Sequence, residues 1–171
     1  MESTPSPEDT LCRQCGLCCD GHLFADVRLR NEEVPPIEST VGYERRSDAF
    51  YLQQPCLAFC DGDCKVYSQR PKGCREFECH LLKAVKEFTL PEYAALELIK
   101  EIKRKIESVE QLLVDLGEAD EMLPLSLRIE AVLSEAWDLS ESEHRQEKRE
   151  ALFQESTTLE GTLEAQFRAD S

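Results

Sequence analysis

The stretch "CRQCGLCCDG", Cys12–Gly21, puts four of the chain's nine cysteines into eight positions. Cys12, Cys15 and Cys18 recur every three residues, a spacing that lets a tight loop direct successive thiolates at one metal centre. Cys19 adjoins Cys18, and the side chains of neighbouring residues usually diverge. We therefore expect Cys19 to face a different centre or a different edge of the same one.

The other five cysteines lie in "PCLAFCDGDCKVYSQRPKGCREFEC", residues 55–79. They are Cys56, Cys60, Cys64, Cys74 and Cys79. Turn-forming residues separate them, and such turns let thiols that are distant in sequence converge. Nine thiolates exceed the four that a single zinc ion or a cubane takes. The sequence therefore indicates either two centres, or one centre with other thiols left redox-active or inert.

The N-terminus, "MESTPSPEDT", lacks the basic start and apolar run of a secretory signal, so we expect a cytoplasmic protein. No apolar run reaches the length of about 18 residues that a membrane span needs. In the reducing cytosol a dense cysteine pattern favours metal binding or catalysis over disulfides. The odd number of cysteines, nine, would also leave one thiol unpaired.

The chain is acidic, with a net charge of −15, and the charge is unevenly spread. Residues 1–89 carry 15 acidic and 11 basic side chains, whereas residues 90–171 carry 20 and 9. Such a field repels phosphate backbones and anionic lipid, so we expect neither nucleic acid nor a membrane as a partner.

All nine cysteines precede residue 80, and this asymmetry divides the 171 residues. We predict an α+β fold in which a small, metal-organised, cysteine-rich head with short strands precedes a helical hairpin and a polar tail. The expected divisions are a disordered N-terminus at 1–10, the head at 11–83, the hairpin at 84–139 and an acidic tail, helical or disordered, at 140–171. The alternating stretch 22–30 and the stretch 47–56 are the predicted strands, and the pattern turns helical from residue 76.

The helical half begins with Thr89, Pro91 and Glu92, which resemble a capping box. A stripe of apolar residues at spacings of three and four follows, and Gly117 suits the end of that helix. The stripe consists of Leu96, Ile99, Ile102, Ile106, Val109, Leu113 and Leu116. We expect a second helix after Pro124, including Leu139 and bordered by Trp137, to pack back as a hairpin. Homodimerisation through the stripe, or a protein partner there, is the alternative.

The cysteine pattern resembles that of the YkgJ-type CxxCxxCC cysteine-cluster family, described as a zinc- or iron-chelating domain. The resemblance covers roughly residues 12–83. The matching positions are Cys12, Cys15, Gly16, Cys18, Cys19, Pro55, Cys56, Cys64, Tyr67, Arg70, Pro71, Cys74, Arg75, Phe77 and Cys79. The resemblance implies that eight cysteines are metal ligands, with Cys60 as an additional thiol and the least certain ligand.

Arg70 and Arg75 flank Cys74, and their guanidinium groups could offset the charge of a thiolate cluster, although ion pairs with Glu76 or Glu78 explain them equally well. His22 and His80 lie near cysteines, and we expect surface or supporting roles for them because thiolates are so abundant.

Three classes of function remain open. The first is a binding module whose head is organised by an iron–sulfur cluster or zinc, since both accept four thiolates. The second is an iron–sulfur-dependent redox or protein-modifying enzyme, because the family includes a flagellin lysine N-methylase. The third is metal storage or delivery. The number of thiolates and their ferredoxin-like spacing favour iron–sulfur over zinc.

Overall fold

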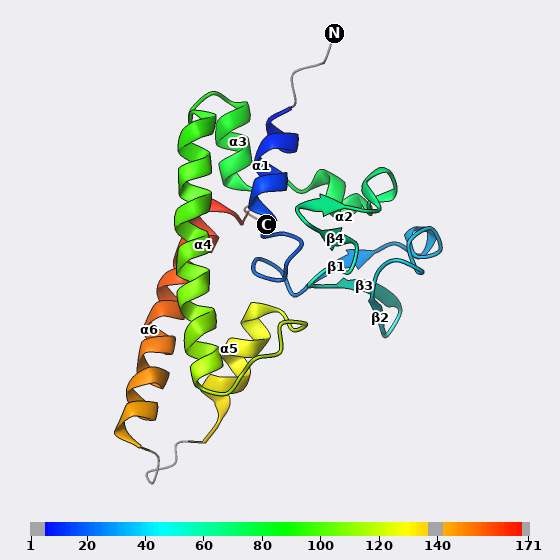
Figure 1. The fold of residues 1–171 in the computed structure, drawn as a ribbon. Coiled ribbons are helices and arrows are strands. Elements are labelled where there is room, and N and C mark those ends of the chain that lie inside the picture. The colour runs from blue at the N-terminus through cyan, green and yellow to red at the C-terminus, as the bar shows by residue number, and fades with distance from the viewer. Residues whose placement is uncertain (1–5, 137–141, 169–171) are drawn as a thin grey trace.

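The computed structural model describes residues 6–136 and 142–168. The predicted α+β class is confirmed, because a small strand-containing head precedes a larger helical part (Figure 1). The helices are α1 (Pro7–Cys15), α2 (Lys72–Glu76), α3 (His80–Lys86), α4 (Glu92–Asp115), α5 (Leu125–Ser134) and α6 (Glu143–Gln166), with 3-10 turns at Asn31–Glu33 and Tyr67–Gln69. The strands are β1 (Asp26–Leu29), β2 (Tyr43–Arg46), β3 (Ala49–Gln53), β4 (Phe59–Cys60) and β5 (Asp63–Cys64).

The head contains a three-stranded antiparallel sheet in the order β1-β3-β2 and a separate β4-β5 hairpin. Strands β1 and β3 lie within the two stretches whose patterns predicted strands, and their register places Val27 opposite Leu52. Strand β2 was not predicted because its sequence, YERR, is exposed throughout and has no apolar alternation. It pairs with β3 along its length, and the Arg46 guanidinium also donates to the Asp26 carboxylate of β1.

Helix α4 is the long central element of the helical part, and its predicted apolar stripe is buried except for Leu96, which is partly buried. Helix α6 packs along α4, and α1, α3 and α5 contact it elsewhere (Figure 1). The stripe is therefore covered within one chain. Gly117, at φ +97°, follows the last turn of α4 as predicted.

The predicted capping box at Thr89 is wrong. The Thr89 hydroxyl donates to the carbonyl oxygen of Ala84 at 3.0 Å, and Pro91 occupies the N-cap position of α4 without a capping side chain. The proline's fixed φ favours the turn before the helix, so α4 still begins where expected, at Glu92.

The helical part includes most of the predicted tail, residues 140–171, and is therefore larger than the two-helix hairpin predicted for residues 84–139. Helix α6, within residues 140–171, buries Leu152, Leu159 and Leu163 against the α4 side of the core. Helix α5 is short and ends at Ser134. Trp137 and Leu139, expected near the hairpin seam, lie outside the described residues.

At the N-terminus, α1 begins at Pro7, so the stretch expected to be disordered overlaps a helix that continues into the cysteine motif. Leu11 of α1 is 3 % exposed and belongs to the helical core. A second, smaller core lies under the sheet and includes Leu29, Ile37 and Leu52. Across the described residues, no helix is both long and apolar enough to cross a bilayer.

Candidate metal centres

Eight of the nine cysteines line a single cavity of about 300 Å³ between the two cores. They are Cys12, Cys15, Cys18, Cys19, Cys56, Cys64, Cys74 and Cys79. None of the nine cysteines, all of which lie in the described part of the chain, forms a disulfide. These eight are also the cysteines that the family resemblance selects.

Four of them form a group beside the helical core, which we call the first quartet: Cys12, Cys15, Cys18 and Cys79. Burial raises the pKa of Cys15 to about 12, with further contributions from the charges of Cys79 and Cys12. Burial also raises the pKa of Cys18 strongly, and the charges of Cys15, of the adjacent Cys19, and of Cys79 and Cys12 add to the effect. The sulfurs are therefore within electrostatic range of one another.

The second quartet lies beside the sheet core and contains Cys19, Cys56, Cys64 and Cys74. Burial raises the pKa of Cys19 to about 12, and the charges of Cys56, Cys74 and Cys64 raise it further. Burial likewise raises the pKa of Cys74 to about 11, followed by the charges of Cys56 and Cys64. Each quartet would have to lose several protons to bind a metal as thiolates, because the thiolate is the ligand form.

Local backbone features bring these cysteines together. Gly16, at φ +76°, ends α1, so the chain turns between Cys15 and Cys18. The amide of Cys56 donates to the carbonyl oxygen of Cys19 at 2.8 Å, which ties two members of the second quartet. Cys79 is the N-cap of α3, where its sulfur accepts from the Leu82 amide at 3.4 Å.

Cys60 lies apart from both quartets. It is exposed on the β4-β5 hairpin, does not line the cavity, and contacts the Asp61 carboxylate at 3.5 Å. Cys60, the cysteine that does not match the family pattern, is thus also the cysteine that lies outside the cavity.

The two arginines occupy different positions. The Arg70 guanidinium stacks 3.7 Å from the centre of the Tyr67 ring, and its charge lowers the pKa of Cys74 against the larger effect of burial. Arg75 is exposed, and its charge acts on Glu33. Of these two arginines, Arg70 is thus the one whose charge affects the pKa of a quartet cysteine.

The two histidines near the cysteines face the helices. His80 Nδ1 lies 3.2 Å from the carbonyl oxygen of Ala165, near the end of α6. His22 lies between Asp20 and Glu110. The contact between His22 and Glu110 spans 88 residues, and no pattern in the sequence marks it.

The donor set fits a thiophilic metal or an iron–sulfur cluster, because soft thiolates favour these groups. Gln54 also lines the cavity; it is 3 % exposed, and its Oε1 has no hydrogen-bond partner among the described residues. Within residues 6–136 and 142–168, however, no three Cys, His, Asp or Glu side chains converge closely enough to hold a single ion. The quartets are sets of neighbours around a space, not closed ion sites.

Comparison with known proteins agrees with this chemistry. A family described as "CxxCxxCC: Putative zinc- or iron-chelating domain" matches residues 11–105, which include every cysteine and most of the length of α4. No curated protein and no solved structure matches the chain significantly. With more than half of its residues matched, the chain belongs to the CxxCxxCC family of metal-chelating domains.

Proposed function

We propose that this chain is an iron–sulfur protein whose head holds two cysteine-ligated centres, one in each quartet. The observation that carries the proposal is the division of eight cysteines into two groups of four around one cavity. Four thiolates are the usual ligand number for an iron–sulfur cluster. Cys60 takes no part in either centre.

The size of the cavity that the two quartets line supports iron–sulfur clusters over zinc. Four sulfurs bound about 2.3 Å from one zinc ion lie roughly 3.8 Å from each other. In a cubane each thiolate binds a different iron, so the sulfurs stand farther apart around an inorganic core. The cavity of about 300 Å³ is large for bare ions, since it is roughly ten times the ~30 Å³ that one water molecule takes up in the liquid.

The number of thiolate ligands indicates what kind of role the proposed centres have. A centre with four protein thiolates has no open position for a substrate, whereas catalytic zinc sites keep one. Full ligation therefore favours electron transfer or organisation of the fold over direct substrate activation. The family description names chelation and no reaction, and it carries no methylase activity to this chain. Cavity-lining cysteines without disulfides also suit the reducing cytoplasm, which we propose as the location of the protein.

Anaerobic purification followed by iron, zinc and acid-labile sulfide analysis tests the proposal. We expect iron and sulfide, with visible absorption from sulfur-to-iron charge transfer. Cys15→Ser and Cys74→Ser should each lose about half of the iron, because each removes a ligand from a different quartet. Cys60→Ser is the matched control and should keep all of it. A colourless wild-type protein with stoichiometric zinc and no sulfide would replace the iron–sulfur proposal with a zinc one.

A further inference from the structure

The loop that carries Cys18 and Cys19 is held in place by the C-terminal half of the chain. The Leu125 amide, at the start of α5, donates to the Gly21 carbonyl oxygen at 3.0 Å. Arg168 Nη2 donates to the Leu23 carbonyl oxygen at 3.2 Å. Both partners come from beyond residue 105, where the family match ends.

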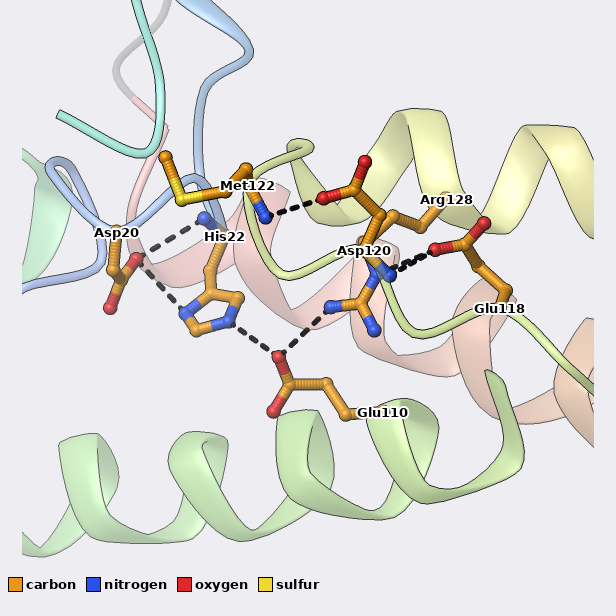
Figure 2. A network of polar contacts seen from close by, with 7 residues as sticks. All are labelled: Asp20, His22, Glu110, Glu118, Asp120, Met122 and Arg128. Atoms are coloured by element: carbon orange, nitrogen blue, oxygen red, sulfur yellow. Dashed lines mark hydrogen bonds and ion pairs between the residues drawn. The ribbon is translucent and has the colours of Figure 1, made fainter. Parts of the chain in front are cut away.

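The strongest of these connections is a chain of alternating charges (Figure 2). Asp20 Oδ1 lies 2.9 Å from His22 Nδ1, and His22 Nε2 lies 3.2 Å from Glu110 Oε1 on α4. The same Glu110 oxygen is 3.4 Å from Arg128 Nη1 on α5. Arg128 Nε lies 3.5 Å from Glu118 Oε1, which closes the chain at the end of α4.

Two members of this chain of charges, Arg128 and His22, are largely removed from solvent. Arg128 is 3 % exposed, so its charge requires the carboxylates around it. Burial alone would lower the pKa of His22, but contacts with Asp20 and Glu110 outweigh that effect and raise it to about 9. His22 is therefore an imidazolium at neutral pH, and it stands between two carboxylates.

Asp20 is the end of the chain that faces the cysteines. It directly follows Cys19, and its Oδ2 lies 3.5 Å from the point that a Cβ on Gly16 would occupy, inside the turn between Cys15 and Cys18. Its backbone amide donates to the Gly16 carbonyl oxygen at 3.1 Å, and the Cys19 amide donates to the same oxygen at 2.7 Å. One carboxylate thus lies in the turn that joins cysteines of both quartets.

We propose that Asp20 is an electrostatic positioning residue shared by both metal centres, and that His22, held by Glu110 and Arg128, offsets its negative charge. This inference rests on the proposed function. In this proposal Glu110 and Arg128, which lie beyond the matched family domain, hold His22 in place. They thereby determine the charge beside the loop that carries cysteines of both centres. Residues that touch neither metal thereby act on the centres through the charge they hold in place.

The test uses the signs of two single substitutions in the anaerobically purified full chain. Asp20→Asn removes the negative charge but keeps an oxygen that can accept from the His22 amide, now 3.2 Å from Asp20 Oδ1. The centres should become easier to reduce. His22→Gln leaves the Asp20 carboxylate without its counter-charge, and the centres should become harder to reduce. We expect each reduction equilibrium to change roughly threefold to tenfold, where tenfold corresponds to about 59 mV for one electron.

The readout is the midpoint potential of each centre in a titration followed by electron paramagnetic resonance. The double variant Asp20→Asn/His22→Gln should return close to the wild-type potentials. His144→Gln, at an exposed histidine paired with Glu147, and Asp48→Asn, at an exposed turn, are the matched controls and should leave both potentials unchanged. If His22→Gln fails to fold, Glu110→Gln is the second variant. It removes one of the two carboxylates that contact His22, and it should change the midpoint potentials by less than His22→Gln is expected to.

Opposite shifts support the inference, because a purely structural role would make both variants behave alike. Shifts of the same sign, or none, while the wild type keeps its iron and sulfide, overturn this inference and leave the proposed function standing. If the wild type holds zinc instead, the proposed iron–sulfur function fails, and the same signs are then sought in zinc affinity by competition with a chelator. Asp20→Asn should then bind zinc more tightly and His22→Gln less tightly.

Discussion

Cys18 and Cys19 are adjacent in the chain but belong to different cores. Cys18 packs against the helical core with Cys15 and Cys79, whereas Cys19 packs against the sheet core with Cys64 and Cys74. The charge of Cys19 nevertheless reaches across, because it contributes to the raised pKa of Cys18. The loop between α1 and β1 is therefore the point where the two quartets meet.

This relationship predicts that substitutions of neighbouring residues remove different centres. Cys18→Ser should lose the centre of the first quartet and keep the second, and Cys19→Ser should do the reverse. Electron paramagnetic resonance of the reduced proteins, together with the iron content, distinguishes the two losses. Identical residual spectra in both variants would show that the quartets act as one site.

The packing of α6 on α4 predicts a large contrast between two neighbouring residues of the tail helix. Leu152 is 0 % exposed, and Leu152→Ala should lower the free energy of unfolding by about 2–5 kcal/mol, because it leaves a cavity in the core. Phe153 is 60 % exposed, and Phe153→Ala should change the stability by only about 0.5 kcal/mol. Chemical denaturation measures both. Equal effects would mean that α6 is not seated on α4 in solution.

The turn at Gly16 predicts a second contrast, between two glycines. Gly16→Ala should cost about 1–2 kcal/mol, because φ is +76° and the new Cβ would lie 3.0 Å from Phe59 Cζ. It should also reduce metal content, since it disturbs the turn that leads from Cys15 to Cys18. Gly161 lies in α6 with open space around it, and Gly161→Ala should stabilise the protein by about 0.5–1 kcal/mol. A Gly16→Ala protein with wild-type metal content and stability contradicts the role of this turn.

The His22 contacts predict a pH dependence of the free energy of unfolding in the metal-loaded protein. The pKa of His22 is about 9 in the folded chain, against 6.5 for an unperturbed histidine. Protonation therefore stabilises the folded state, fully below pH 6.5, and this contribution is lost as the pH rises through about 9. Asp20, Glu110 and Arg128 are the charged groups of this network, from the loop, α4 and α5.

Denaturation of wild type and His22→Gln at several pH values checks this prediction. The stability difference between them should be largest below pH 6.5 and should shrink towards and beyond pH 9. A difference that does not change across this interval would show that the ionisation of His22 is not coupled to folding.

Much of the local structure could be predicted from the sequence, because the patterns that determine it involve residues close together in the chain. The three-residue spacing of Cys12, Cys15 and Cys18 and the divergence of Cys19 are properties of adjacent residues. The apolar stripe of α4 follows from helical periodicity, and Gly117 ends that helix as expected. The capping box failed because Pro91, and not Thr89, occupies the N-cap position of α4, while the Thr89 hydroxyl donates to the Ala84 carbonyl oxygen in the turn after α3.

The sequence by itself determined the α+β class and the family, and it singled out the eight cysteines that line the cavity, since residue types and their spacing are local properties of the chain. Only the tertiary structure decided which thiols are neighbours, because Cys79 joins Cys12 and Cys56 joins Cys19 through contacts between distant segments. The tertiary structure also decided that α6 is a packed helix, because its few apolar residues are buried only through contact with α4. The pairing of His22 with Glu110 across 88 residues depends on the same packing, and local spacing carries no information about it.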